Sequence, residues 1–281
     1  MKETETIYKA INNGNTVRFY ITTPTIFNIQ TGNIKIKNLE SKEVLTLSRG
    51  LFFIKKNIFV EIIGLQNNSD LHFDLIEIPE ITLTRFCREN SEINKNRREW
   101  IKKTKRIRHC NEIISEIKSS MKKQQKSKYS FLKKEHTKTM NSEEKSEYLI
   151  RYILSCFIED RKVPYILFRS SEVTFSEMVF DIIYAAPHEN WSLDDMAKNL
   201  HLSKSTLKRK LQAEGTSFSM ISVLSRINKA AWMLRSNEKK VQSIAKACGF
   251  TNPSHFSTSF KKIFNAPPQQ YRKMFKQHPP H

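Results

Sequence analysis

Residues 192–215, SLDDMAKNLHLSKSTLKRKLQAEG, decide the fold of the C-terminal region. Ser192 precedes two acidic residues, an arrangement that caps the first turn of a helix and suits its dipole. After a short turn, Ser203 can cap a second helix, whose inner face is supplied by Leu207 and Leu211. Gly215 follows at a position suited to a left-handed helix end. The spacing predicts two short helices joined by a tight turn, which is a helix-turn-helix.

The pattern returns about 48 residues later in residues 240–264, KVQSIAKACGFTNPSHFSTSFKKIF. Ile244-Ala245 repeats Met196-Ala197, and Phe256 with Phe260 repeats Leu207 with Leu211. Asn252-Pro253 supplies a cap followed by proline at the first helical position. Apolar residues at intervals of three and four over 218–235 predict one long helix between the two units. The predicted C-terminal architecture is therefore all-α, with two helix-turn-helix units on one connecting helix.

The outward faces of the second helix in each unit are polar. Arg209 suits the O6 and N7 edge of guanine, and Lys208 suits phosphate. The outward set of the second unit is neutral apart from two lysines, so we expect weaker base discrimination there and contacts to the DNA backbone. The predicted DNA contacts are Ser205, Thr206, Lys208, Arg209 and Gln212 in the first unit, and Ser254, His255, Ser257, Thr258, Lys261 and Lys262 in the second.

The charge of the chain indicates a polyanionic partner. Lys and Arg number 48 against 28 Asp and Glu, which gives a net charge of +20 over 281 residues. Residues 85–140 carry 18 basic and 6 acidic groups, and residues 170–281 carry 16 and 8. Nucleic acid is the first candidate partner and an anionic membrane surface the second. Any amphipathic helix has a solvated polar face, but the repeat, the caps and the charge together favour DNA binding.

The N-terminal region has a β pattern followed by a helical one. Seven short runs rich in Phe, Ile, Val and Thr predict a small barrel or sandwich: Val17–Thr22, Thr25–Ile29, Asn33–Asn38, Glu43–Ser48, Leu51–Lys55, Phe59–Leu65 and Leu71–Ile78. From Arg85 through Trp100 to Ile117 the pattern is helical and basic. Residues 118–140 are predicted to be a solvated helix end or mobile loop, with a second DNA contact as the alternative.

A helix predicted over residues 143–159 has a broad apolar face. Packing on the β-unit and pairing with a second copy are both open for this face. We assign dimerisation to Leu149, Ile150, Ile153, Leu154 and Phe157. The predicted domains are 1–163, with regulatory and dimerisation roles, a linker at 164–172, and a DNA-binding domain at 173–281.

The sequence offers no site for catalysis, a metal or a cofactor. Residues 1–84 contain one histidine, His72, and the four cysteines form no CxxC pair. Walker, HExxH and GxSxG motifs are absent, so we do not expect an enzyme. The N-terminus has no apolar leader and no segment is long enough to cross a membrane, so we expect a cytoplasmic, nucleoid-associated protein with no membrane partner.

The C-terminal residues resemble the AraC/XylS family of bacterial transcription regulators. The resemblance covers about 100 residues and includes Trp191-Ser-Leu193, Leu202-Ser203, Gly215-Thr-Ser-Phe218, Cys248-Gly-Phe250, Phe260-Lys-Lys-Ile-Phe264, Ala266-Pro267 and Tyr271. Leu51–Lys56 and Phe73–Pro79 are similar to the virulence-activator branch, of the HilD, HilC and RtsA type. The resemblance implies an α+β protein with a cupin-like N-terminal β-domain and helices, a homodimer or a heterodimer with related regulators, promoter DNA as ligand, and contact with RNA polymerase.

Some members of that branch bind fatty acids, which suppress DNA binding, and one basic position of that site falls on Arg235. Another falls on Thr25 or Trp232, neither of which is charged. Arg235 is also explained as a cation that complements the C-terminal dipole of its helix. The predicted function is a sequence-specific transcription regulator that activates virulence or invasion genes under fatty-acid modulation. The alternative is a nucleoid-type architectural protein without strong sequence specificity.

Overall fold

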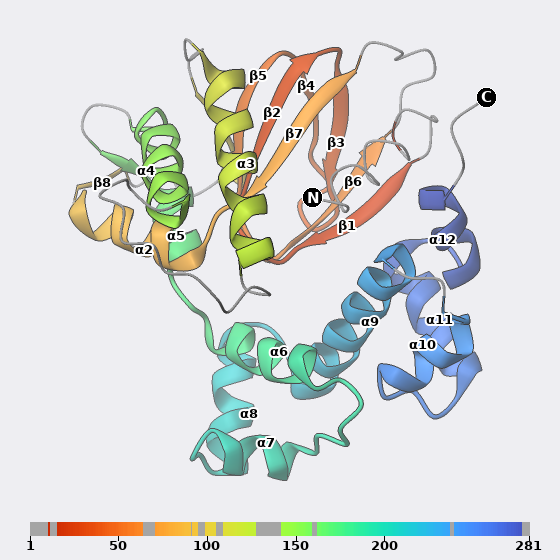
Figure 1. Cartoon of the computed structure of the whole chain (residues 1–281). Coiled ribbons are helices and arrows are strands. Elements are labelled where there is room, and N and C mark those ends of the chain that lie inside the picture. Colours follow the sequence, from red (N-terminus) through yellow and green to blue (C-terminus); the bar gives the residue numbers. More distant parts are fainter. Residues whose placement is uncertain are drawn as a thin grey trace. The chain divides into compact units, whose positions relative to one another are not determined.

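The computed structural model (Figure 1) describes residue 11 and residues 16–63, 71–90, 92–94, 99–104, 109–127, 142–158, 162–236 and 239–276. The chain divides into two compact units. One comprises Tyr20–Glu172, and the other comprises Val173–His281 together with Met1–Phe19. Among the described residues, no helix combines the length and the apolar character that a membrane crossing requires.

The N-terminal unit is built on two four-stranded sheets. One has the order β1-β6-β3-β4, and the other has the order β7-β2-β5-β9. Their bounds are β1 (Val17–Ile21), β2 (Thr25–Thr31), β3 (Ile34–Asn38), β4 (Val44–Leu47), β5 (Gly50–Ile54), β6 (Ile58–Ile63), β7 (His72–Glu77) and β9 (Ile101–Lys103). Burial alternates along β3 and β6, as expected for strands with one face in a core. The seven predicted strands are confirmed to within two residues at each end.

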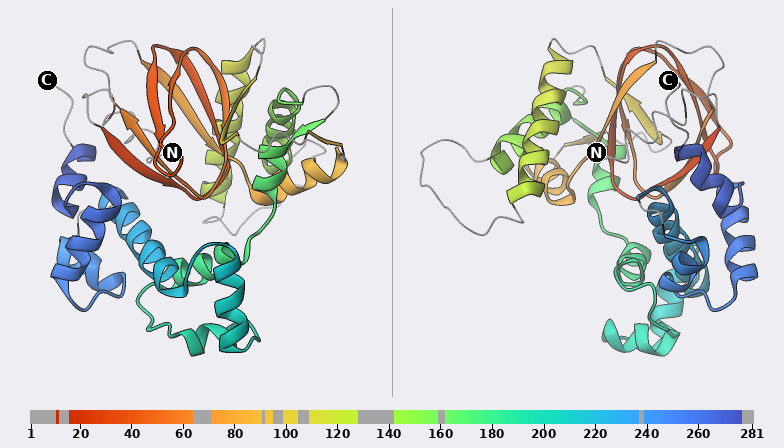
Figure 2. Two further views of the ribbon diagram at one scale, coloured as in Figure 1. Left: turned by 180° about the vertical axis from the view of Figure 1, so that it is seen from behind. Right: turned by 45° about the vertical axis from the view of Figure 1, so that its right-hand side comes forward.

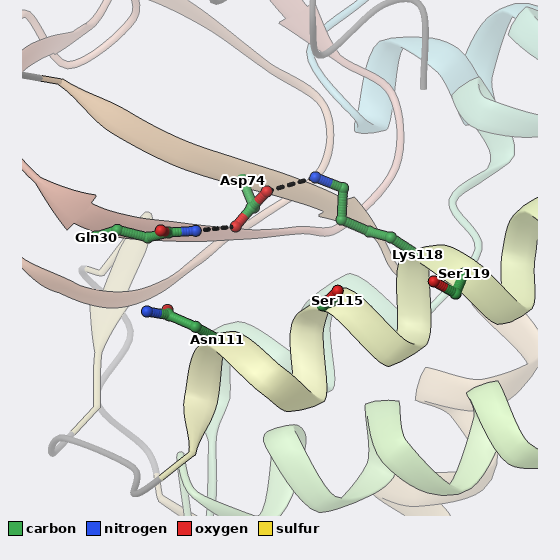
Figure 3. Close-up of a pocket in the computed structure, with 6 residues that line it drawn as sticks. All are labelled: Gln30, Asp74, Asn111, Ser115, Lys118 and Ser119. Carbon is green, nitrogen blue, oxygen red and sulfur yellow. Dashed lines mark hydrogen bonds and ion pairs between the residues drawn. The ribbon is translucent and has the colours of Figure 1, made fainter.

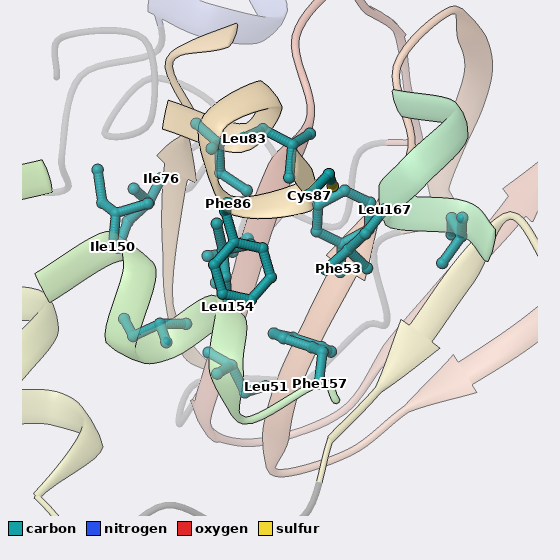
Figure 4. Close-up of a cluster of buried hydrophobic side chains, with 14 of the residues drawn as sticks. Leu51, Phe53, Ile76, Leu83, Phe86, Cys87, Ile150, Leu154, Phe157 and Leu167 are labelled. Carbon is teal, nitrogen blue, oxygen red and sulfur yellow. The ribbon is translucent and has the colours of Figure 1, made fainter. Parts of the chain in front are cut away.

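Helices cover one face of the sheet β7-β2-β5-β9 (Figures 1 and 4). They are α2 (Glu80–Glu89), α3 (Cys110–Ser127), α4 (Ser142–Ser155) and α5 (Tyr165–Ser171), beside a short parallel pair of β8 (Ile93–Asn94) and β10 (Val163–Pro164). Phe53 of β5 meets Phe157 edge to face, with ring centroids 6.1 Å apart. Each large apolar side chain buried in this way contributes about 1.5–3 kcal/mol. Sheet and helices therefore share one cluster of buried apolar side chains, part of which Figure 4 shows.

The prediction of a linker over residues 164–172 is wrong. Tyr165–Ser171 form α5, and Ile166 and Leu167 are buried in the core of the N-terminal unit. Thr84 Oγ1 of α2 donates a hydrogen bond to the carbonyl of Ser171 at 3.1 Å. Because this packing holds the segment inside the unit, the boundary between the two units falls after Glu172.

The helical prediction for residues 85–117 is wrong at Trp100 and Ile101. Ile101–Lys103 form β9, which pairs antiparallel with β5. Trp100 Nε1 donates a hydrogen bond to Glu43 Oε2 at 2.6 Å. The physical reason is that β5 otherwise leaves an unpaired sheet edge, which this short strand closes. Of residues 118–140, 118–127 continue α3, and 128–140 lie outside the described residues.

The apolar face of α4 lies inside the N-terminal unit. Ile150, Ile153, Leu154 and Phe157 are at most 1% exposed, and Leu149 is partly buried against the same core. The sequence left two partners open for this apolar face, the β-unit and a second copy of the chain. The structure shows that the face packs on the β-unit and its helices. The assignment of the four buried residues to a dimer interface is wrong, because their side chains have no surface left for another chain. The assignment of Leu149, which is partly exposed, stays a prediction.

From Val173 onward the C-terminal unit is all helical, and residues 17–19, which are grouped with it, form the start of β1. The long connecting helix is confirmed. The helices are α6 (Phe175–Ala185), α7 (Leu193–Asn199), α8 (Lys204–Ala213), α9 (Phe218–Ser236), α10 (Val241–Ala247), α11 (Pro253–Phe264) and α12 (Pro268–Lys276). Ile221, Ile227 and Leu234 form the buried stripe of α9. Within this unit, α8 and α11 lie toward opposite ends of α9 (Figures 1 and 2).

Candidate nucleic-acid interface

The first helix-turn-helix consists of α7 and α8, each with a side-chain cap. Ser192 Oγ accepts from the backbone N–H of Asp195, and the Asp195 carboxylate accepts from the N–H of Ser192, both at 3.1 Å. The Ser192 hydroxyl also donates to the Asp195 carboxylate, and this bond, together with the one from the Ser192 N–H, holds the pKa of the exposed Asp195 carboxyl below its ordinary value. Ser203 Oγ accepts from the N–H of Thr206 at 3.2 Å and caps α8. Both predicted caps are confirmed.

The second helix-turn-helix consists of α10 and α11. Asn252 Oδ1 accepts from the N–H groups of Ser254 at 2.8 Å and His255 at 3.2 Å, with Pro253 at the first helical position as predicted. Behind α11 the core is aromatic, and the rings of Phe260 and Tyr271 meet edge to face at 5.2 Å. Packing against α12 thus holds α11 in place in the second helix-turn-helix.

The two helix-turn-helix units have equivalent cores, and the turn of the second is one residue longer, since the caps Ser203 and Asn252 are 49 residues apart. Met196, Ala197, Leu207 and Leu211 in the first unit, and Ile244, Ala245, Phe256 and Phe260 in the second, are all at most 2% exposed. Both first helices end with the same backbone hydrogen bond, from Leu202 to Ala197 at 2.8 Å and from Phe250 to Ala245 at 3.0 Å. The repeat in the sequence is therefore a repeat in space.

The predicted DNA contacts lie on the outer faces of α8 and α11. Thr206 is half-buried, and the other ten are exposed: Ser205, Lys208, Arg209, Gln212, Ser254, His255, Ser257, Thr258, Lys261 and Lys262. Burial of Leu207 and Leu211 on the opposite side of α8 leaves its polar face toward solvent. This exposure is what contact with DNA requires, while the role of each residue stays a prediction.

Basic side chains on α8 divide into engaged and available groups. Lys204 pairs with Asp194 at 2.5 Å, and the Lys210 ammonium lies 5.1 Å from the centre of the Phe175 ring. Within the described part of the chain, Lys208 and Arg209 form no ion pair or hydrogen bond. Their charges are therefore available to an anionic ligand.

Glu214 is a functional candidate that the sequence analysis missed. Its carboxylate lies just after α8 and accepts from the N–H groups of Phe175 at 2.9 Å and Ser176 at 2.8 Å, at the start of α6. Burial alone raises the pKa of Glu214, but the hydrogen bonds from Ser176 and Phe175 and the charge of Lys210 outweigh it, so the pKa lies below its ordinary value. An acid just before a helix-ending glycine is the only sequence signal, and it does not reveal the distant partner.

A polar pocket of about 260 Å³ lies between α3 and the sheet of the N-terminal unit (Figure 3). Asp74 accepts from Gln30 Nε2 at 2.7 Å and forms an ion pair with Lys118, so the opposite charges in the pocket neutralise each other. Polar walls of this kind do not suit an acyl chain. Among the described residues, no group of three or more His, Cys, Asp or Glu side chains could hold a metal.

Arg235, the predicted ligand-binding residue, is engaged within the C-terminal unit. Its Nη1 donates to Tyr271 Oη at 2.7 Å, and its guanidinium lies 5.8 Å from the centre of the Phe275 ring. Both partners belong to α12, so Arg235 ties the end of α9 to that helix. A ligand contact by Arg235 stays a prediction.

Comparison with known proteins identifies the C-terminal unit. Residues 196–274 match the family model of a helix-turn-helix domain. Transcriptional regulator SirC of Salmonella typhimurium is 25% identical over 275 residues, which cover 90% of this chain and 86% of SirC. Residues 196–274 therefore form a helix-turn-helix domain. Transcriptional activator PerA of Escherichia coli is 25% identical to this chain over 264 residues, which cover 91% of the chain and 88% of PerA.

Solved structures of ToxT from Vibrio cholerae share the α+β fold. A point-substituted apo form of ToxT has a TM-score of 0.66 at 19% identity, covering 93% of this chain and 94% of ToxT. A form bound to an unsaturated fatty acid has a TM-score of 0.61 at 18% identity, covering 93% and 92%. The predicted fold class, a β-domain with helices before a two-unit helical domain, is confirmed.

Proposed function

We propose that this protein is an AraC-type, sequence-specific transcription regulator of the activator type, which reads promoter DNA with α8 and α11. The observation that carries the proposal is the pair of equivalent helix-turn-helix units, whose second helices, α8 and α11, are both capped and have exposed polar faces. Arg209 and Lys208 lie on the first of these faces without a partner among the described residues. We assign Arg209 to a guanine edge and Lys208 to phosphate.

The two recognition helices enter successive major grooves on one face of the duplex, about 34 Å apart. One chain then covers an asymmetric site with two half-sites. In α11 the lysines Lys261 and Lys262 follow the backbone, and the neutral residues before them give weaker base discrimination. This proposal leaves no enzymatic step for the chain to perform.

The names of the relatives support the biological role. SirC is named a transcriptional regulator and PerA a transcriptional activator. We propose that this protein likewise activates genes of a virulence or invasion programme, contacts RNA polymerase at the promoter, and acts on the nucleoid in the cytoplasm. Genome-wide mapping of bound sites, with transcript levels in a deletion strain, tests the regulon and the direction of control.

A specificity ratio separates this function from the architectural alternative. Sites are first selected from random duplexes with the full chain, and affinity for a selected duplex is then compared with affinity for random duplex at one salt concentration. We expect the selected duplex to bind at least about 10³ times more tightly. Equal affinity for the two would instead support an architectural protein, which reads charge and shape alone.

Fatty-acid control is a second candidate, favoured by the likeness to ToxT, for which one structure holds an unsaturated fatty acid. Oleate at saturating concentration should raise the unfolding temperature and weaken promoter binding. Arg235→Ala should reduce both effects. A matched change, Arg272→Ala, alters another arginine of the C-terminal unit and should leave them intact. No response of the wild-type chain to oleate would rule this candidate out.

A dimer, with itself or with a related regulator, is also part of the proposal. Because the inner face of α4 is in the core, the surface to test is the outer face, where Tyr148 and Tyr152 are 61% and 50% exposed. Sedimentation should show that Tyr148→Ser with Tyr152→Ser shifts a wild-type dimer toward monomer. An unchanged dimer would place the contact elsewhere.

A further inference from the structure

Arg226, in α9, contacts the backbone of the loop before the first helix-turn-helix unit and of the turn inside the second. Its Nη2 donates to the carbonyl of Glu189 at 3.0 Å, in the loop that leads into α7. Its Nη1 donates to the carbonyl of Gly249 at 3.4 Å, in the turn of the second unit. A half-buried guanidinium keeps its charge and needs acceptors around it, which these carbonyls supply. One side chain therefore links the entry of the first unit to the turn of the second.

Gly249 brings the backbones of the same two segments into direct contact. A Cβ at this position would lie 2.3 Å from the carbonyl oxygen of Pro187 and 3.3 Å from the Arg226 guanidinium carbon. Backbone oxygen cannot retreat as the end of a flexible side chain can. Any residue larger than glycine would therefore push the second turn away from the loop before α7.

The turn of the first helix-turn-helix can be compared directly with the turn that contains Gly249. His201 holds the equivalent place in the first unit, 48 residues earlier, with φ of +53° against +76° at Gly249. His201 is exposed. A positive φ alone therefore does not require glycine at this turn, and the close approach to Pro187 is what sets Gly249 apart.

We propose that Arg226, Gly249 and the backbone of Pro187 and Glu189, which we call the inter-repeat joint, determine the half-site spacing that one chain accepts. The inference rests on the proposed DNA-binding function. Two recognition units linked in one chain gain affinity through effective concentration only when both can reach their half-sites together. A rigid joint restricts this gain in affinity to one half-site spacing. A loosened joint lowers the affinity at that spacing and allows binding at neighbouring spacings.

The test uses the full chain and a selected duplex, with the segment between the half-sites lengthened or shortened by one and two base pairs. Wild type should bind best at the selected spacing. Arg226→Ala and Gly249→Ala should lose about tenfold or more at that spacing and discriminate less among spacings. Affinity for a duplex with one half-site scrambled should stay as in wild type. Circular dichroism confirms that each variant is folded.

Two controls match these changes. Arg272→Ala removes an arginine of α12 that also donates to a backbone carbonyl, that of Lys239 at 2.5 Å. This bond joins α12 to the segment before α10 and does not reach the loop before α7. His201→Ala changes the equivalent turn of the first unit. Both should keep the wild-type spacing preference. A folded Arg226→Ala with unchanged preference overturns the proposal.

A readout without DNA separates failure of the joint from failure of the proposed function. Spin labels are introduced at the equivalent exposed positions Lys198 and Lys246, through encoded amino acids that leave the native thiols unmodified. The distance distribution between them should be narrow in wild type and broader in Arg226→Ala. If Arg226→Ala leaves the width of the distance distribution unchanged, the inter-repeat joint is overturned whatever the DNA result. If the distribution broadens in Arg226→Ala but the wild-type chain shows no selective DNA binding, only the proposed function is contradicted.

Discussion

At the scale of single residues, Arg209 and Lys208 are neighbours on α8 with different predicted roles. Arg209→Ala should cost about 1–3 kcal/mol on a selected duplex and relax preference at one base position, because a bidentate contact to guanine is lost. Lys208→Ala should weaken all duplexes alike and reduce the salt slope by about one unit, because one phosphate contact is lost. Binding titrations over a salt series measure both. Equal losses on selected and random duplex for Arg209→Ala would contradict its assignment.

Glu214 gives a second prediction at this scale, with a defined pH dependence. Its folded-state pKa lies below the ordinary 4.5, so its stabilisation is fully present above that pH and is lost as the pH falls through the lower folded value. Glu214→Gln should cost up to about 1 kcal/mol at pH 7, limited by solvent exposure. Urea titrations should show this difference shrinking below pH 4.5. A difference that stays constant down to pH 3 would show that the charge is irrelevant.

At the scale of elements, the cap of α11 is the clearest stability prediction. Asn252→Ala leaves the N–H groups of Ser254 and His255 without their acceptor and should cost about 1 kcal/mol of unfolding free energy. Asn252→Asp keeps an acceptor and adds a charge that the helix dipole favours, so it should be neutral or stabilising. Chemical denaturation of the C-terminal transition measures both variants. If the two substitutions destabilise equally, the side chain does not act as a cap.

The elements that could be predicted from sequence are those whose signal is local. Ser203 and Asn252 stand directly before the helices they cap, and burial alternates residue by residue along β3 and β6. By contrast, β9 is stabilised by hydrogen bonding to the edge of β5, and α5 is stabilised by burial of Ile166 and Leu167 in the core of the N-terminal unit. Glu214 and Arg226 bond backbone groups 37 to 39 residues away. Such long-range contacts have no periodicity, so neither residue could be found from the sequence.

At the scale of the whole molecule, two compact units with separate cores predict two thermal transitions. Phe157→Ala should lower only the transition of the N-terminal unit, and Phe260→Ala only that of the C-terminal unit, each by about 3–5 kcal/mol, because each ring is buried in its own core. A selected duplex at about 100 times its dissociation constant should stabilise the C-terminal transition by about 2.7 kcal/mol, because only that folded unit binds it. Calorimetry with and without duplex measures these shifts. A single transition that both substitutions lower equally would show that the units unfold as one, and DNA binding would then be linked to the stability of the β-unit as well.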